Sequence, residues 1–376
     1  MKIAIDGRPL CRGLAGTAMF QKLAINSMLK YWKNVQLVLI CPSVIPLDLR
    51  NEWEGSLMLI EDSKSILSKC SPFLWYTIKM PYFLRKINAD LFWTPSPSLT
   101  YFIPHNTKKM IIVHDLVFKQ FSNTMSWKNR LQSRLIFEYS LNHADYIWTN
   151  SLYTRTELLK YYPYLESVPI FTGLSVDNLL YRKIAVNEDS ITMIQKKYNI
   201  INRKFILFVG TLEPRKNLHF LLSLMPEIFK RSGLKLLVVG GKGWNYNKII
   251  SDLMTVDEIK NATIFAGYIT NEELANLYNM AYVCVSTSLN EGFGMPLLEA
   301  LFCGCPVICP NNSAMKEVVD GIGTTIDGWN GEEWIETILH KVPARIENVT
   351  IPEKYNWKYI INNLWKFLQQ DVLIRI

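Results

Sequence analysis

Two series of short runs with β-strand character, each alternating with amphipathic segments, constrain most strongly how this chain folds. In the first half, the runs with strand character are residues 3–6, 35–41, 91–94, 110–114 and 146–149. In the second half, they are residues 205–210, 235–240, 262–266, 281–285 and 306–309. Strands that alternate with helices form parallel sheets with right-handed crossovers. The pattern therefore predicts an α/β protein with two such units.

The length supports a division into two domains. A chain of 376 residues exceeds what a single core usually supports, and a polar, loop-like stretch at 175–187 separates the two series. Ligands of parallel sheets bind beyond the carboxyl ends of the strands, so we expect the two units to face each other across a cleft. The last helical run, 357–370, is amphipathic and is predicted to pack on a domain surface.

Composition excludes several classes of protein. The seven cysteines are scattered through apolar segments without zinc-site spacing, which favours a reducing cytoplasm and predicts no metal site. The first residues enter a predicted strand at once and lack the long apolar core of a signal peptide, so we expect no export, and no apolar run approaches the roughly 20 residues needed to span a bilayer. The net charge of +8 is compatible with attraction to anionic lipid or nucleic acid. A nucleic-acid binder would need basic residues aligned as a stripe with stacking aromatics, whereas the acidic pocket proposed below would repel phosphates locally, so we expect no nucleic-acid partner.

Glu299 is the most distinctive single residue, because it is the only charged residue in 292–310. Burying an ionised carboxylate is costly unless a donor or an opposite charge compensates, so the sequence predicts a donor beside Glu299. The Gly-Phe-Gly turn that opens this segment and Pro296 predict a helix N-terminus, which attracts phosphate. A carboxylate that accepts from a cis-diol beside such amides indicates a nucleotide-sugar pocket with Glu291 at its mouth. The alternative is a buried helix with a structural glutamate.

A second cluster follows the strand predicted at 205–210. Arg215, Lys216 and Asn217 stand between that strand and the next helical pattern. Arginine offers a planar fork for phosphate oxygens and lysine a compact charge, so the pair could neutralise a departing nucleoside diphosphate. Asn217 is suited to cap the following helix. The alternative is a solvated turn with the same cap.

Two further candidates lie in the first half. His114 ends a predicted strand, where its ring could bond sugar hydroxyls; the alternative is a structural histidine bonded to Asp115. Gly16 belongs to a glycine-containing segment at 11–17 that could let the backbone approach a phosphate or an acceptor. This segment lacks the G-x-G-x-x-G spacing of a dinucleotide site, and no acidic residue is placed to bind NAD.

Aromatic and basic residues interleave at 73–86 and again around Trp127, Lys128, Arg130 and Arg134. Trp and Tyr favour the headgroup region of a bilayer and Lys and Arg attract anionic lipid, so these segments could attach reversibly to a membrane surface. Core aromatics with solvated charges are the alternative.

Together these clusters resemble the retaining GT-B glycosyltransferases of family 4. The resemblance is to the bacterial polysaccharide branch, with its Glu-Pro-Arg-Lys-Asn and Gly-Gly-Lys-Gly-Trp segments, here 213–217 and 240–244. It covers nearly the whole chain, through Ile-Asp-Gly-Arg-Pro at 5–9, Val-His-Asp-Leu at 113–116, Thr-Asn-Ser at 149–151, Phe-Ala-Gly-Tyr-Ile at 265–269, the pair Glu291 and Glu299, and Tyr-Asn-Trp at 355–357. Many relatives have arginine directly after the strand-ending glycine; this chain has Thr211 there, and we expect Arg215 to supply the charge.

The resemblance implies two Rossmann-like domains with parallel sheets facing across a cleft. Residues 1–178 would bind the acceptor, residues 179–356 would bind the donor, and helix 357–376 would pack back on the first domain. The residues implied in the transfer itself are His114, Lys216 and Glu291. The residues implied in donor binding are Gly16, Arg215, Lys216, Tyr268, Ile269, Glu291, Phe293, Gly294 and Glu299.

Within this set, Glu299 would hold the donor ribose, Glu291 the donor sugar, and Lys216 with Arg215 the diphosphate. Transfer would retain the anomeric configuration by front-face attack, with no metal or other cofactor. The implied activity is hexosyl transfer from a nucleoside diphosphate, with GDP-mannose as the first expectation, to a lipid-linked or growing polysaccharide of the O-antigen or capsule type. The enzyme would be cytoplasmic, either free or peripheral on the inner face of the cytoplasmic membrane. The alternatives are dTDP-rhamnose or a UDP-hexose as donor, a GT-B epimerase or hydrolase, and a catalytically silent sugar-binding subunit.

Overall fold

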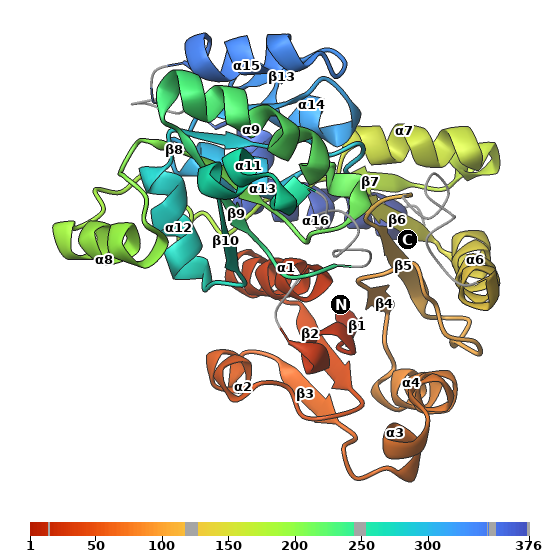
Figure 1. Ribbon diagram of the computed structural model, residues 1–376. Helices are drawn as coiled ribbons and strands as arrows, with labels where there is room; N and C mark the ends of the chain where they lie inside the picture. Colours follow the sequence, from red (N-terminus) through yellow and green to blue (C-terminus); the bar gives the residue numbers. More distant parts are fainter. Residues whose placement is uncertain (14–15, 117–126, 244–252, 344, 346–350, 374–376) are drawn as a thin grey trace. The chain divides into compact units, whose positions relative to one another are not determined.

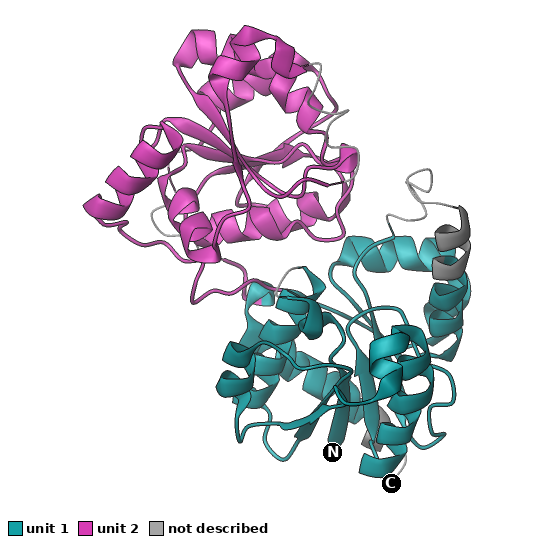
Figure 2. Ribbon diagram, turned by 60° about the horizontal axis from the view of Figure 1, so that its bottom comes forward, with its two compact units in different colours: residues 1–174, 354–376 teal, residues 175–353 magenta. Residues whose placement is uncertain are grey.

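The protein is described by a computed structural model that covers residues 1–13, 16–116, 127–243, 253–343, 345 and 351–373 (Figure 1). The chain divides into two compact units (Figure 2). Unit 1 comprises residues 1–174 and 354–376, and unit 2 comprises residues 175–353. The predicted boundary between the two series lay at 178/179.

Unit 1 is built on a parallel sheet of seven strands in the order β3-β2-β1-β4-β5-β6-β7. The strands are β1 (Lys2–Asp6), β2 (Gln36–Cys41), β3 (Met58–Glu61), β4 (Leu91–Thr94), β5 (Lys108–Val113), β6 (Tyr146–Thr149) and β7 (Ile170–Thr172). Its α-helices are α1 (Thr17–Tyr31), α2 (Leu47–Trp53), α3 (Ile66–Cys70), α4 (Pro72–Ile87), α6 (Trp127–His143), α7 (Leu152–Tyr161) and α16 (Trp357–Leu373). The central strands β4 and β6 are buried along their whole length, which is why they read as uninterrupted apolar runs.

Both faces of the unit 1 sheet carry a packed core. One core brings Ile111 and Val113 of β5 together with Trp75, Met80 and other buried side chains of α4. A second group of aromatic side chains includes Trp93 of β4 and Trp148 of β6, whose ring centroids lie 5.9 Å apart, with Phe20 of α1 at their edges. Helices therefore cover the sheet on both sides, the arrangement expected for crossover connections.

The C-terminal helix α16 packs on α1 within unit 1. The indole N–H of Trp32 donates to the Ile361 carbonyl at 3.0 Å, and the rings of Trp32 and Trp365 lie 5.2 Å apart. The apolar positions of α16, among them Ile361 and Leu364, are fully buried. Its amphipathic pattern thus reflects packing against a neighbouring helix.

Unit 2 has a parallel sheet of six strands in the order β10-β9-β8-β11-β12-β13. The strands are β8 (Phe205–Val209), β9 (Lys235–Val239), β10 (Thr263–Gly267), β11 (Val283–Val285), β12 (Val307–Pro310) and β13 (Thr324–Ile326). Its α-helices are α8 (Glu188–Tyr198), α9 (Leu218–Ser232), α11 (Asp257–Ala262), α12 (Asn271–Met280), α13 (Met295–Phe302), α14 (Ser313–Val319) and α15 (Gly331–His340). Buried side chains of α9, such as Leu221 and Met225, pack on Ile206 and Phe208 of β8.

The two parallel sheets confirm the predicted α/β class, and every strand predicted from the sequence is present. Three strands were missed: β3, β7 and β13. Each lies at or near a sheet edge, and β7 and β13 have only three residues each. Strands this short and only partly buried carry too little apolar periodicity to be recognised.

The turns after β8 and β9 touch each other through glycines. A Cβ atom on Gly240 would lie 2.0 Å from the carbonyl oxygen of Gly210, and the φ of Gly240, +147°, is rare for residues with a side chain. The Gly240 N–H also donates to Gly267 at 2.9 Å, which holds it in place. A Cβ on the adjacent Gly241, in contrast, would meet nothing within 4 Å.

We therefore expect Gly240→Ala to lower the free energy of unfolding of unit 2 by about 2–4 kcal/mol, because the added methyl group must push apart two backbone turns. The matched variant Gly241→Ala should change it by less than about 1 kcal/mol. Urea unfolding followed by circular dichroism measures both. Equal midpoints for the two variants would contradict the close approach of these turns.

Candidate active site

The candidate site lies at the carboxyl ends of two neighbouring strands of unit 2. Strands β8 and β11 pair directly, so the segments that follow them, 210–217 and 286–291, meet at one edge of the sheet. Hydrogen bonds join the two segments: Leu289 N–H donates to the Arg215 carbonyl at 2.8 Å, and the Thr287 hydroxyl lies 3.0 Å from the Lys216 carbonyl. The backbone that carries Arg215 and Lys216 is thus fixed against the segment that carries Glu291.

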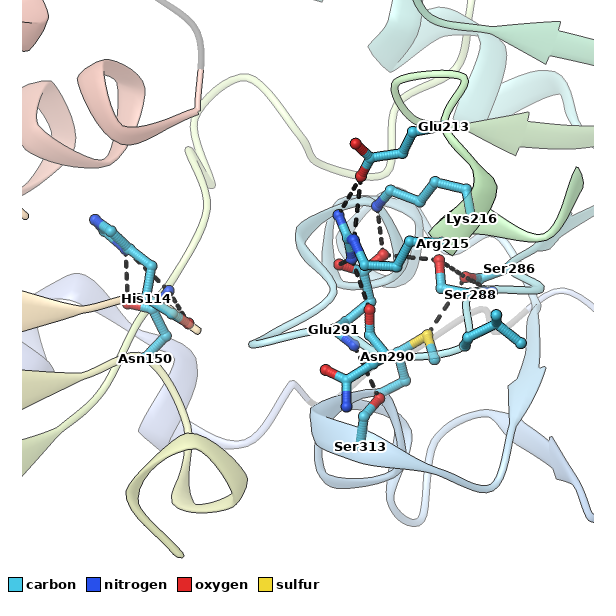
Figure 3. A network of polar contacts seen from close by, with 12 residues as sticks. His114, Asn150, Glu213, Arg215, Lys216, Ser286, Ser288, Asn290, Glu291 and Ser313 are labelled. Carbon is cyan, nitrogen blue, oxygen red and sulfur yellow. Dashed lines mark hydrogen bonds and ion pairs between the residues drawn. The ribbon is translucent and has the colours of Figure 1, made fainter. Parts of the chain in front are cut away.

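Glu291 is the centre of the polar network drawn in Figure 3. One carboxylate oxygen accepts from Arg215 Nη1 at 2.7 Å, and the other accepts from Lys216 Nζ and, at 2.7 Å, from the Ser288 hydroxyl. The Glu291 side chain is 13% exposed. Burial acts to raise the pKa of Glu291, but the charges of Lys216 and Arg215 outweigh it and lower the pKa to about 2. Glu291 is therefore a carboxylate at neutral pH.

Arg215 and Lys216 differ in how many of their donors are already engaged. Arg215 also donates to Glu213 Oε1 at 2.6 Å and to the Asn290 carbonyl at 2.6 Å. Lys216 Nζ donates to Glu291 alone among the described residues and has two further N–H groups. Its aliphatic chain passes 3.3 Å from the position that a Cβ on Gly210 would occupy. Lys216 is thus the better placed of the two to donate to a ligand, whereas Arg215 mainly holds Glu213 and Glu291.

Glu299 lies on α13 and is 8% exposed. The donor that the sequence predicted for it is present: the Tyr278 hydroxyl, from α12, donates to Glu299 Oε2 at 2.9 Å. Burial raises the pKa of Glu299 to about 7, although the hydrogen bond from Tyr278 acts in the opposite direction. Within the described part of the chain, Oε1 accepts no hydrogen bond. One oxygen of this carboxylate is thus held in place and the other is left to accept from a ligand.

The helix N-terminus predicted beside Glu299 is also present. Helix α13 begins at Met295 with Pro296 in its first turn, and Gly294 is its N-cap with a φ of +98°. Phe293 is buried, and a Cβ on Gly294 would lie 3.3 Å from the Met315 side chain. Glycine at 294 is therefore favoured both by the positive φ and by the close approach of the Met315 side chain. Asn217 is the N-cap residue of α9, but its side chain makes no capping hydrogen bond, contrary to the prediction.

Tyr268 and Ile269 directly follow β10, which lies two strands from β8 in the sheet. Tyr268 is 76% exposed and Ile269 is buried. Tyr268 is therefore available to a ligand, whereas Ile269 packs in the protein. In the Gly-Gly-Lys-Gly-Trp segment, Trp244 lies outside the described residues, as do the side chains of Trp127, Lys128 and Arg130.

The two candidates from the first half belong to unit 1. His114 follows β5, and both ring nitrogens have partners: Nε2 lies 2.7 Å from the Pro95 carbonyl and Nδ1 lies 3.1 Å from Asn150 Nδ2 (Figure 3). A carbonyl only accepts, so Nε2 carries the proton and Nδ1 accepts from Asn150. Burial lowers the pKa of His114, which keeps the ring neutral. Gly16 is the N-cap residue of α1 with a φ of +52°, and a Cβ there would meet nothing within 4 Å.

Several residues of the network were not anticipated. Glu213 and Ser288 stand within three residues of predicted site residues, in polar turns, and could have been suspected on that ground. Tyr278 lies on a separate helix and carries no local signal. Among the described residues there is no group of three or more His, Cys, Asp or Glu side chains that could hold a metal ion. None of the described helices combines the length and apolar character needed to cross a membrane.

Known proteins are similar to this chain in sequence and in fold. Residues 190–338 match the family described as glycosyl transferases group 1. O-antigen chain mannosyltransferase B of Escherichia coli is 29% identical over 239 residues, which cover 60% of this chain and 59% of that protein. O-antigen chain mannosyltransferase RfbU of Salmonella typhimurium is 25% identical over 365 residues, which cover 94% of each chain. The alignments with the first two curated relatives thus span about three fifths of their length.

The solved structure of Anabaena HepE in complex with UDP-glucose covers 100% of both chains with a TM-score of 0.69 at 16% identity. At this identity the similarity concerns the fold. The group 1 match falls within unit 2, which holds the Glu291 network and Glu299. The match assigns residues 190–338 to the group 1 glycosyltransferases, and the two parallel α/β sheets, with the similarity to HepE, show that the chain has the GT-B fold.

Proposed function

We propose that this protein is a retaining glycosyltransferase that takes a hexose from a nucleoside diphosphate bound by unit 2. The observation that carries the proposal is the pairing of a half-buried carboxylate, Glu291, with Lys216 and Arg215 at the carboxyl edge of the sheet. This places an anion that can accept from sugar hydroxyls beside a lysine whose remaining N–H groups can donate to phosphate. Glu299 would accept from the ribose diol with its unengaged oxygen.

In the proposed reaction the bond between the anomeric carbon and the β-phosphate oxygen breaks while the acceptor oxygen attacks from the same face. The acceptor proton passes to the departing phosphate oxygen, so no protein base is needed. Lys216 would neutralise the charge that develops on the diphosphate. Glu291 would orient the sugar by accepting from a hydroxyl at Oε2, which accepts only from Arg215 among the described residues. It is not proposed as a nucleophile, because Arg215, Lys216 and Ser288 hold both of its oxygens in place.

The backbone amides of Phe293 and Gly294 would donate to the diphosphate. Tyr268 and Ile269 would form the loop that contacts the nucleotide base. Arg215 would hold Glu291 in place. For unit 1 we propose acceptor binding, with His114 near the transferred sugar and Gly16 near the phosphates. His114 is neutral and held at both nitrogens, so its role would be to present its ring edge rather than to transfer a proton. The proposed reaction uses no metal or other cofactor.

We infer that the transferred sugar is mannose from GDP-mannose and that the acceptor is a lipid-linked or growing polysaccharide of a bacterial surface glycan. The support for mannose is the names of the curated relatives, which include two O-antigen chain mannosyltransferases. The enzyme would work in the cytoplasm, at the inner face of the membrane. A UDP-hexose is the second candidate donor, because HepE, which shares the fold, is described in complex with UDP-glucose.

A ligand screen followed by a transfer assay tests the proposal. A ligand at 100 times its dissociation constant stabilises the native protein by about 2.7 kcal/mol, so thermal unfolding with GDP-mannose, UDP-glucose and dTDP-rhamnose should single out one donor. When that donor carries a labelled sugar, the protein should transfer the label to lipids in membranes from a strain that lacks the gene, and the label should appear in the lipid extract. Free sugar or an epimerised donor formed without membranes would indicate a hydrolase or epimerase instead. Stabilisation without any product would indicate a silent binding subunit.

A further inference from the structure

Two cysteines of unit 1 meet where β1 and β2 end. Cys41 is the last residue of β2, which pairs with β1 (Figure 1), and Cys11 lies in the short 3-10 helix η1 (Pro9–Arg12) shortly after β1. Cys11 Sγ lies 3.5 Å from the carbonyl oxygen of Gly7 and 3.5 Å from that of Ser43. The Cys11 side chain therefore lies between the segment that follows β1 and the segment that follows β2.

Cys41 reaches the same place from the sheet. It is fully buried, and a Cβ atom on Gly7 would lie 2.2 Å from Cys41 Sγ. Gly7 is thus next to both sulfur atoms: its carbonyl oxygen faces Cys11, and its missing side chain leaves the room that Cys41 Sγ occupies. The Cys41 side chain forms a hydrogen bond with Cys11, and both thiols are free. The two sulfur atoms are therefore direct neighbours.

The two thiols of this pair differ in charge and in access to solvent. The hydrogen bond with Cys41 lowers the pKa of Cys11 to about 6, opposed by burial and assisted by Ser43. The same hydrogen bond, together with burial, raises the pKa of Cys41. Asp6 acts to raise both pKa values, but Arg8 pairs with Asp6 at 2.7 Å. Cys11 is half-buried, so a partly accessible thiolate lies against a buried, protonated thiol.

The other five cysteines lack this combination. Burial raises the pKa of the four cysteines of unit 2, which keeps them as protonated thiols: Cys284, Cys303, Cys305 and Cys309. Cys70 is exposed at the end of α3, and within the described part of the chain it forms no hydrogen bond with another cysteine. Oxidation selects cysteines by thiolate character and exposure, and a neighbouring thiol can then close a disulfide. These conditions are met together at Cys11.

We propose that Cys11 and Cys41 form an oxidation site that reacts with hydroperoxides and closes a reversible disulfide. The Cys11 thiolate attacks one oxygen of the hydroperoxide, so a sulfur–oxygen bond forms, the oxygen–oxygen bond breaks, and the second oxygen leaves as hydroxide when the oxidant is hydrogen peroxide. The Cys41 sulfur then attacks the sulfenic sulfur of Cys11. The disulfide forms, and the oxygen leaves as water with the proton of Cys41. The two sulfurs lose the two electrons that the peroxide gains.

The disulfide would tie η1 to the end of β2. Its two sulfurs must come to about 2 Å from each other, much closer than hydrogen-bonded thiols, so oxidation draws η1 toward the sheet. The chain runs from η1 through Gly13 to Gly16, the N-cap residue of α1. In a reducing compartment a disulfide of this kind is transient and reports on the oxidant. The inference goes beyond the proposed transfer reaction and requires neither donor nor acceptor, so either proposal can fail while the other stands.

Peptide mapping after peroxide treatment tests the oxidation site. The full-length chain carries Cys70→Ser, which prevents disulfides between the exposed cysteines of two molecules. An equimolar amount of hydrogen peroxide should produce a peptide that joins the Cys11 and Cys41 segments and has lost two hydrogen atoms. Dithiothreitol should separate this peptide into its two parts. The four cysteines of unit 2 should remain free thiols throughout.

Two further variants in the same background separate the roles of the two sulfurs. Cys41→Ser should stop at the sulfenic acid of Cys11, which dimedone traps. Cys11→Ser changes a half-buried position, so the variant should fold, and its Cys41 should stay unmodified. A disulfide between Cys11 and a cysteine other than Cys41 would overturn the proposal. So would two free thiols at a peroxide dose that fully oxidises glutathione, or oxidation of Cys41 in Cys11→Ser at the rate of the unchanged pair.

Discussion

Lys216→Ala should reduce kcat/KM for sugar transfer by about 10² to 10³-fold, the size of effect seen when a preorganised donor to a developing negative charge is removed. Lys216 Nζ contacts Glu291 alone among the described residues, so its remaining N–H groups are the ones free to donate to the departing diphosphate. The loss should appear mainly in kcat, because the charge on the phosphate grows as the glycosidic bond breaks.

The fold should survive this change. Glu291 keeps its hydrogen bonds from Arg215 and Ser288, so truncation of Lys216 does not leave the half-buried carboxylate without partners. The matched control is Lys230→Ala, which removes an exposed lysine from α9 in the same unit and should leave kcat/KM unchanged. Initial rates with the donor identified by ligand screening measure both. Transfer by Lys216→Ala at the rate of the control would exclude Lys216 from the chemistry.

Glu299→Gln should weaken donor binding about 10 to 100-fold, because hydrogen bonds to a charged group contribute about 1.5–3 kcal/mol. The Tyr278 hydroxyl can still donate to the amide oxygen, and the side-chain volume hardly changes, so the core around α13 should remain intact. Exposed Glu227 on α9 provides the control, Glu227→Gln, with unchanged binding expected. Titration calorimetry with the donor measures the dissociation constants.

The pH dependence gives the same variant a second signature. With a pKa of about 7, Glu299 is protonated at pH 6 and ionised at pH 8. The ionised form accepts stronger hydrogen bonds from the hydroxyls of a diol than the protonated form does, so donor binding should strengthen as the pH rises through about 7 in the unchanged protein. Glu299→Gln cannot titrate and should lack this increase. An identical pH profile in the two proteins would show that Glu299 does not contact the donor.

The α/β architecture was predictable because both sheets are parallel and their central strands are buried. Such strands appear as apolar runs, and this signal alone predicted both ends of β4 and of β6 correctly. The edge strands β3, β7 and β13 were not found, because a strand that is only partly buried or only three residues long carries no distinctive apolar run. Edge strands are recognised by their pairing, which is a tertiary property.

The candidate site was only partly predictable, for a related reason. An isolated acid in an apolar segment must have a donor, so a partner for Glu299 could be anticipated. Its identity could not, because Tyr278 comes from α12 and the contact depends on how α12 and α13 pack. Likewise, two cations in a strand-end turn suggested phosphate binding. The sequence did not reveal that Glu291 and Glu213 already engage Arg215 and leave Lys216 with more free donors.

Calorimetric titration of one nucleoside diphosphate and its parent nucleoside into three proteins tests the assignment of unit 2 most directly. The proteins are the unchanged chain, Lys216→Ala and Glu299→Gln, all at pH 8, and the nucleotide is the one that stabilises the chain against unfolding. Lys216→Ala should weaken binding of the diphosphate but leave binding of the nucleoside unchanged. Glu299→Gln should weaken both, because both carry the ribose diol. Unchanged affinities in both variants would contradict a donor site built on Lys216, Glu291 and Glu299.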